Sequence, residues 1–263
     1  MTALGLGMRQ GVLEIKQFFR SRESFVFTLL FPVLLLVIFG AIFNFEIAPG
    51  VQFTQYFAAG MLAAGLLAVG FQNLAIQIPI ERDRGVLKRL RGTPMPPWVY
   101  FAGKVGMVLG AGVLITAVLL TVGVLFYDVP LPATTGAWLT LGWVSALGIT
   151  ACTLLGIAFS SVARTGRGAP AVVTPIALVL QFISGVFFVY TQLPAWMQQV
   201  AALFPLKWMT QGMRSVFLPD SYAAQEVAGS WELGRVALVL AAWCVAGLLL
   251  CLFTFRWTTR RDG

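Results

Sequence analysis

Six long apolar runs without a charged residue constrain this chain more than any other feature of its sequence. They contain no Asp, Glu, Lys or Arg and cover residues 25–43, 57–77, 105–127, 138–162, 170–190 and 236–255. About 20 mostly apolar residues are enough for an α-helix to cross the hydrocarbon core of a bilayer. A charged side chain at the centre of such a helix costs about 2.5–3.5 kcal/mol, so its absence favours insertion. The runs therefore predict an all-α integral membrane protein with six transmembrane helices.

The composition agrees with this class. Of the 263 residues, 59% are hydrophobic and 11% are charged, whereas soluble domains average about 25% charged residues. No polar stretch is long enough for a second core, so residues 1–263 are predicted to form one membrane domain. The net charge of +8 lies in short segments between the apolar runs. This is how Lys and Arg orient membrane spans, and we expect a bilayer and no nucleic acid as a partner.

The charge of the connecting segments predicts the orientation. Basic residues gather in the head, in the loops after the second and fourth runs, and in the tail. The loops after the first and third runs carry no Lys or Arg and offer Glu46 and Asp128 instead. The positive-inside rule then places both termini in the cytoplasm. No cleavable signal peptide is visible, so the first run is expected to stay in the membrane.

Two segments outside the runs have patterns of their own. Residues 1–24 repeat apolar side chains every three or four positions with basic residues between them, which predicts an amphipathic helix in the inner interface. Residues 191–235 contain two apolar stretches that are too short to cross, and we expect them to enter the outer leaflet and turn back. Arg214 lies among apolar residues there and needs a partner. The candidates are Asp220, Glu226 and Glu232.

The lack of histidine and of acidic residues in the apolar runs argues against two other classes of membrane protein, ion-coupled carriers and enzymes. An ion-coupled carrier usually has intramembrane Asp, Glu or His, and none of the six runs contains one. A membrane-embedded enzyme needs clustered carboxylates, histidines or a nucleophile with its base. The chain has no histidine, and Cys152, Cys244 and Cys251 lie in apolar runs without metal-ligand spacing. We expect no metal site and no catalytic residues.

The charged loop at residues 78–104 is the most informative stretch. It contains Glu81-Arg82-Asp83-Arg84-Gly85 and then Val86-Leu87-Lys88-Arg89-Leu90-Arg91. Alternating charge is typical of an exposed helix, so the second span is expected to continue into the cytoplasm as a rigid charged helix. Thr93-Pro94 should end it, and Pro96 and Pro97 should keep the chain extended until Trp98. Such a helix suits docking onto a soluble partner, although a plain basic loop would have the same composition.

This loop resembles the signature of ABC-2 type permeases, the membrane subunits of ATP-binding-cassette exporters. The matching positions are Glu81, Arg82, Gly85, Leu87, Leu90, Thr93, Pro94, Gly103 and Lys104. A second resemblance lies at Pro205, Leu206 and Arg214, which match a structural motif on the outer side. Trp208 departs from that motif, since tyrosine, histidine or serine is commoner there.

The resemblance implies a division of labour between subunits. Two permeases, either two copies or two sister chains, would pair above two copies of a separate ATPase subunit. The chain lacks the G-x-x-x-x-G-K-[ST] loop that cradles phosphates, so ATP and Mg would be bound by that partner, and this chain would need no cofactor and would not itself be an enzyme. The resemblance assigns contact with the ATPase to Glu81, Arg82, Asp83, Arg84, Gly85, Leu87, Leu90, Arg164 and Arg167.

In similar transporters the second and fifth spans line the pathway. The side chains that these spans offer here are Phe71, Gln72, Asn73, Gln77, Gln181, Phe182 and Ser184. The amides could equally form hydrogen bonds between helices. No charged residue lies in a span, so the expected cargo is apolar or amphipathic: a drug, an antibiotic or a lipid. A polysaccharide or glycolipid exporter is the alternative within the family. The expected location is a bacterial plasma (inner) membrane.

Overall fold

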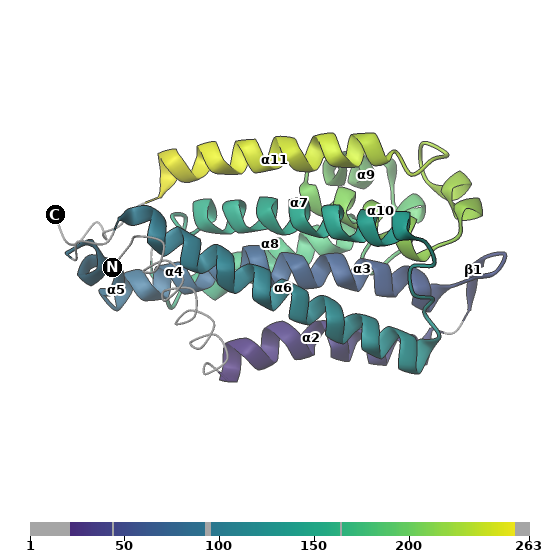
Figure 1. The fold of residues 1–263 in the computed structure, drawn as a ribbon, viewed down its shortest axis with the longest axis horizontal. Coiled ribbons are helices and arrows are strands. Elements are labelled where there is room, and N and C mark those ends of the chain that lie inside the picture. The colour runs from purple at the N-terminus through teal and green to yellow at the C-terminus, as the bar shows by residue number, and fades with distance from the viewer. Residues whose placement is uncertain (1–21, 44, 93–95, 164, 256–263) are drawn as a thin grey trace.

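The structure is a computed structural model that describes residues 22–43, 45–92, 96–163 and 165–255. It is an elongated bundle of roughly parallel helices (Figure 1). The predicted helix at residues 1–24 lies outside the described residues apart from its last three positions, which begin the first helix of the bundle. The elements are α2 (Arg22–Ile42), β1 (Glu46–Ala48), β2 (Val51–Gln52), α3 (Phe53–Leu67), η1 (Ala68–Gln72), α4 (Asn73–Asp83), α5 (Val86–Arg91), α6 (Pro97–Tyr127), α7 (Thr135–Phe159), α8 (Ala169–Ile183), η2 (Tyr190–Gln192), α9 (Ala195–Ala202), α10 (Pro205–Phe217), η3 (Asp220–Gln225) and α11 (Leu233–Thr254).

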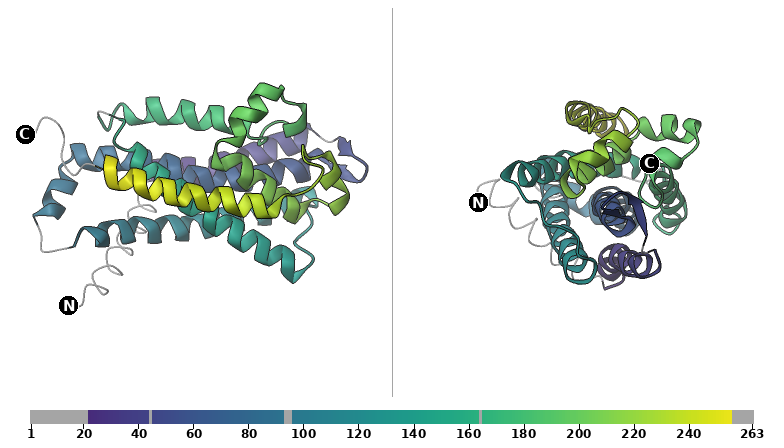
Figure 2. Two further views of the ribbon diagram at one scale, coloured as in Figure 1. Left: turned by 90° about the horizontal axis from the view of Figure 1, so that it is seen from above. Right: turned by 90° about the vertical axis from the view of Figure 1, so that its right-hand side faces the viewer.

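One continuous helix made of α3, η1 and α4 forms the centre of the bundle. Viewed along the bundle, α3 is surrounded by other helices (Figure 2), and nearly every residue of α3 is buried. Its small residues allow close approach: a Cβ added at Gly65 would lie 2.9 Å from the Ile115 side chain on α6. Small residues at helix contacts are the usual solution where lipid removes the hydrophobic drive for association.

The central helix widens to a π-helical turn at η1, where α7 packs against it. A Cβ added at Gly156 of α7 would lie 2.6 Å from the Gly70 carbonyl oxygen and 2.8 Å from that of Phe71. The backbones of the two helices therefore touch at this point. π-helical turns inside α-helices occur frequently at functional sites, and this one lies directly before Asn73.

Helices α7 and α11 are held together by small and weakly polar side chains. Cys244 and Cys251 donate their S–H groups to the carbonyls of Leu147 and Leu154, at 3.5 and 3.0 Å. Because the two cysteines are seven residues apart, they lie on one face of α11. Within the described residues, no group of His, Cys, Asp and Glu could hold a metal ion. Through these hydrogen bonds Cys244 and Cys251 contribute to the packing of α11 on α7.

Four helices in the described part of the chain are long and apolar enough to cross a membrane. They cover Phe53–Asp83, Trp98–Tyr127, Thr135–Phe159 and Leu233–Thr254, and the Leu30–Ile42 part of α2 and Ala169–Ile183 are shorter apolar segments. The predicted run at 170–190 is not one helix, because α8 ends at Ile183. Gly185 adopts a left-handed φ of +74°, and a Cβ there would lie 2.8 Å from that of Tyr190. Only glycine fits this turn.

A short antiparallel hairpin of β1 and β2 lies at one end of the bundle (Figure 1). The all-α prediction did not include it. Pro49 and Gly50 form its turn, with Gly50 at a φ of +73°. Proline followed by a glycine of positive φ is typical of a type II turn, so the local sequence does carry this signal.

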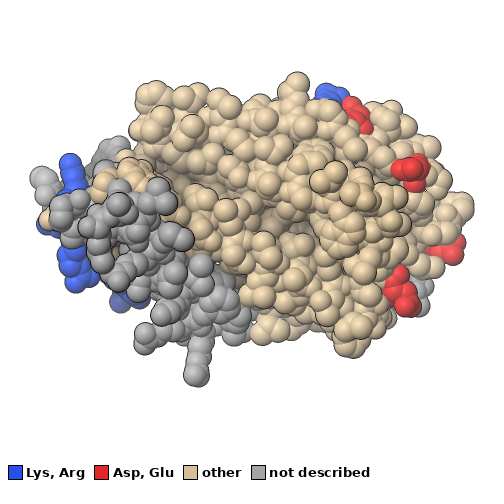
Figure 3. Space-filling model, in the orientation of Figure 1, with Lys and Arg blue, Asp and Glu red and all other residues tan. Residues whose placement is uncertain are grey.

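The charges separate to the two ends of the molecule. The space-filling view shows blue at one end, mostly red at the other, and a wide uncharged region between them (Figure 3). We name the first the basic end, where α5 lies, and the second the acidic end, where the hairpin lies. Exposed or half-buried carboxylates at the acidic end are Glu46, Asp128, Asp220 and Glu232.

Candidate functional site

The charged segment at the basic end is two helices and not one. Helix α4 ends at Asp83, and Gly85 takes a left-handed φ of +69° before α5 begins at Val86. Leu87 is fully buried, so α5 folds back against the bundle. The expected rigid extension is therefore wrong beyond Asp83, because a positive φ cannot occur inside an α-helix.

The return path also differs from the prediction. Helix α6 begins at Pro97, with Pro96 extended before it, so the chain is already helical before Trp98. Proline suits the first position of a helix, where its missing N–H would have no partner anyway. Thr93 and Pro94 lie outside the described residues.

Glu81, predicted to face a soluble partner, turns into the bundle and is only 5% exposed. Its carboxylate forms an ion pair with Lys104 and accepts a hydrogen bond of 2.8 Å from the Tyr100 hydroxyl. Lys104 and Tyr100 are themselves buried. They are four residues apart and so share one face of α6. In this structure Glu81 joins α4 to α6, and little of its side chain is exposed.

The next two residues hold α4 to the connection between α7 and α8. Arg82 donates to the Ser160 carbonyl at 3.2 Å, and the Asp83 carboxylate accepts from the Gly166 N–H at 2.6 Å. Successive helical residues point about 100° apart. The triplet therefore reaches α6 on one side and the α7–α8 connection on another.

The basic side chains that follow remain exposed. Within the described residues at this end they are Arg84, Lys88, Arg89, Arg91 and Arg167, which we call the basic face. Arg164 lies outside the described residues. The predicted coupling set therefore divides: Glu81 and Leu87 are buried inside the protein, whereas the basic face is open to a partner.

The predicted pathway residues are spread over different surroundings. Phe71 and Asn73 are buried, and the Phe71 ring packs against Phe159 at 5.5 Å between centroids. The Asn73 amide approaches the Met107 sulfur at 3.8 Å. Gln181 and Ser184 are buried near the end of α8, and Gln72 and Gln77 are half-buried.

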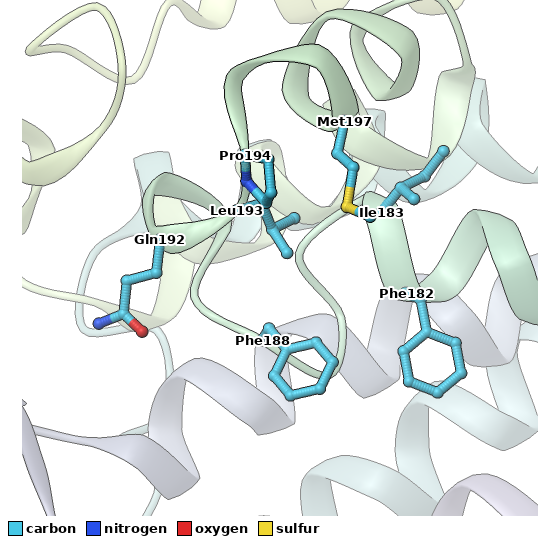
Figure 4. A pocket seen from close by; sticks show the side chains of 7 residues that line it. All are labelled: Phe182, Ile183, Phe188, Gln192, Leu193, Pro194 and Met197. Carbon is cyan, nitrogen blue, oxygen red and sulfur yellow. The ribbon is translucent and has the colours of Figure 1, made fainter.

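An apolar cavity of about 510 Å³ lies where α8 ends and α9 begins (Figure 4). Its lining is Phe182, Ile183, Phe188, Gln192, Leu193, Pro194 and Met197. Phe182 is the one predicted pathway residue among them. The other lining residues escaped prediction because the cavity forms only when the Gly185 turn folds α9 back over α8.

Helix α10 carries the second buried ion pair, close to the acidic end. Arg214 is fully buried, and its Nε and Nη2 lie 2.7 and 3.2 Å from the two carboxylate oxygens of Glu226. The guanidinium also lies over the Tyr56 ring, 5.0 Å from its centroid. The structure thus pairs Arg214 with Glu226, one of the three carboxylates named as candidates. Pro205 begins α10, and Leu206 is buried beside it.

A family model and several known proteins resemble this chain over most of its length. Residues 12–218 match the model of the family described as ABC-2 type transporter. The chain is 26% identical over 209 residues to the inner membrane transport permease YadH of Escherichia coli (strain K12), covering 77% of this chain and 80% of that protein. It is 20% identical over 201 residues to the putative transport permease YvfS of Bacillus subtilis (strain 168), covering 75% and 79%.

A third relative, the probable multidrug ABC transporter permease YbhR of Escherichia coli (strain K12), is 21% identical over 168 residues, covering 64% of this chain and 45% of that protein. The family model spans well over half of the chain, including the charged segment and all of α10. The chain belongs to the ABC-2 type transporter family, as a membrane subunit of an ABC transporter.

Proposed function

We propose that this chain is the permease of an ABC exporter that moves an apolar or amphipathic molecule out of the cytoplasm or the inner leaflet. ATP would be hydrolysed by a separate subunit that also holds Mg. The observation that carries the proposal is the basic face, an exposed cationic surface on and beside the short helix α5, separated from the carboxylates of the acidic end by a wide uncharged region.

The basic end is proposed to face the cytoplasm. Lys and Arg are retained on that side of bacterial membranes, and the exposed or half-buried carboxylates at the far end fit the outer side. Helix α2, with 21 residues, and the shorter α8 would complete six spans with the four long ones. This orientation would put both termini in the cytoplasm.

Helices α9 and α10 are proposed to form a re-entrant pair on the outer side. Trp243, near the middle of α11, donates its indole N–H to the Leu203 carbonyl at 2.9 Å. The turn between α9 and α10 therefore lies level with the middle of a span. Non-helical backbone at that depth is tolerated only when packed against protein, and Trp243 supplies a partner for the carbonyl.

The basic face would dock on an acidic surface of the ATPase. Opposite charges speed encounter and fix orientation, mostly through groups that stay exposed. Two ATPase copies under a pair of permeases, identical or sister chains, would follow the arrangement implied by the family. The pathway would then lie between the permeases, lined by α4 and α8 side chains such as Gln77 and Gln181.

The cargo is proposed to be a drug, antibiotic or lipid. The cavity at the end of α8 has no charged residue in its lining and a single amide, Gln192. The name of YbhR, a probable multidrug permease, points the same way. A polysaccharide or glycolipid remains the alternative, and export of a fluorescent apolar dye would distinguish the two.

The proposal is tested by purifying the chain gently from its native membrane and identifying its companions by mass spectrometry. A soluble protein with a phosphate-cradling loop is expected. The Lys88→Glu/Arg89→Glu variant should lose at least about tenfold in affinity for it, because reversed charges oppose docking. Arg235→Glu, an exposed arginine near the acidic end, is the control and should bind normally. Absence of any ATPase from the native complex would contradict the proposal.

A further inference from the structure

Two charged residues of the sequence signature, Glu81 and Lys104, meet inside the protein. They are 23 positions apart on different helices and form a buried ion pair. Tyr100 completes the cluster: its hydroxyl donates to Glu81, and the Lys104 ammonium lies 5.4 Å from its ring centroid. Both oxygens of the carboxylate are therefore occupied by groups of α6.

A buried ion pair of this kind is not expected to add much to the stability of the fold. Removing two charges from water is costly, and a buried ion pair can often be replaced by apolar side chains without loss. Its geometry, however, defines one relative position of the two helices, since both carboxylate oxygens must meet fixed partners. Buried networks that are fully satisfied can specify a unique arrangement in this way.

The ion pair lies at the end of α4 that leads into α5. Glu81 lies in the last turn of α4, and α5, with most of the basic face, follows directly after the Gly85 turn. A displacement of α5 acts on the end of α4 that Glu81 holds to α6.

We propose that Glu81 is a positioning residue: its carboxylate, through Lys104 and Tyr100, fixes α4 to α6 so that movement of α5 displaces both helices together. This rests on the proposed function for the source of that movement. It separates two roles in the segment, because the basic face binds the partner while the buried cluster transmits its motion. Neither Lys104 nor Tyr100 needs to touch the ATPase.

The test compares three permeases reconstituted with the ATPase: Glu81→Gln, Lys104→Met and the E81Q/K104M variant. Each single variant removes one charge of the buried ion pair and keeps the other, and is expected to lower thermal stability. The double variant removes both charges and should recover stability. The control is E232Q/R235M, which removes the ion pair between Arg235 and Glu232 near the acidic end, where the arginine is exposed.

The deciding readouts are affinity for the ATPase and molecules transported per ATP hydrolysed. We expect the double variant to bind the ATPase within about twofold of wild type. It should transport at least about tenfold fewer molecules per ATP hydrolysed, an effect within the roughly 5- to 150-fold range of coupling between distant sites. Wild-type coupling in the folded double variant would show that the pair is only structural. Loss of ATPase binding by folded Glu81→Gln would show a direct docking contact instead.

A measurement on the permease alone separates this inference from the proposed function. Hydrogen exchange of residues 78–91 in lipid nanodiscs should be at least about tenfold faster in the double variant than in wild type or the control, because the ion pair no longer holds the end of α4 to α6. Unchanged exchange would overturn the inference even if the ATPase binds. If exchange is faster in the double variant but no ATPase partner is found, the positioning role of Glu81 would stand and the proposed function as an exporter permease would be wrong.

Discussion

Among the described residues, each end of the bundle has one buried ion pair, and the two pairs join different kinds of elements. At the basic end, Glu81 and Lys104 connect two long helices across 23 positions. Toward the acidic end, Arg214 of α10 pairs with Glu226, only 12 positions later, in the loop before α11. A pair between long helices can transmit displacement, whereas a pair between a helix and a nearby loop can only close that loop. We therefore expect stability to depend more on the acidic end and coupling more on the basic end.

The largest expected effect is on stability, from Arg214→Ala. It would leave the buried Glu226 carboxylate without its cation, and such a loss costs about 3–5 kcal/mol. Arg235→Ala is the matched control, because Arg235 also pairs with a glutamate near this end but is 64% exposed; it should cost at most about 1 kcal/mol. Thermal unfolding of both variants in detergent measures the difference. Equal losses would mean that burial does not distinguish the two pairs.

The sequence predicts these two regions to different degrees. Arg214 could be assigned to a short set of carboxylates, because an arginine among apolar residues must find a partner and few acids lie nearby. Glu81 could not be placed, because its direction depends on how α6 crosses α4. The alternating charges of the segment are equally compatible with an exposed helix. Only the position of Lys104 on a neighbouring helix determines that Glu81 points inward.

The apolar runs were better guides to the helices than to their ends. Four of the six predicted spans correspond to helices long enough to cross. The turn at Gly185 could not be predicted from the fifth run, because a Ser-Gly pair between apolar residues is also found inside helices. The cavity below that turn was unpredictable for the same reason: its lining residues, such as Phe188 and Met197, come together only through the turn.

The contact between α7 and the π-helical turn lies between the two ends of the bundle, and Gly156→Ala tests how tightly it is packed. Gly156→Ala would push a Cβ against the π-helical turn, 2.6 Å from the Gly70 carbonyl oxygen, and should lower the free energy of unfolding by about 1–3 kcal/mol. Gly142→Ala on the same helix meets nothing within 4 Å and should be neutral or raise stability by up to about 1 kcal/mol. Chemical denaturation of both variants gives the comparison. If Gly156→Ala is also neutral, the contact between α7 and the π-helical turn is looser than the structure indicates.

A smaller effect is expected from Asp83→Asn at the basic end. The amide can still accept the Gly166 N–H but loses the charge that strengthens this bond. Asp83 is exposed, so the free energy of unfolding should fall by no more than about 1 kcal/mol. Asp128→Asn, an exposed aspartate at the acidic end, is the control. Transport per ATP should fall with Asp83→Asn and not with the control; a loss of stability without a loss of coupling would weaken the contrast between the ends.

The smallest expected effect on stability is that of Ser184→Ala, at the C-terminal end of α8. The Ser184 hydroxyl is fully buried and finds no hydrogen-bond partner among the described residues. Its removal should therefore leave the free energy of unfolding unchanged or raise it by up to about 1 kcal/mol. Unfolding and dye export would be measured on the same preparation. Lost export at full stability would support Ser184 as a substrate contact, since stability then cannot explain the defect. Unchanged export would indicate that Ser184 is a packing residue and that this end of the bundle has a structural role.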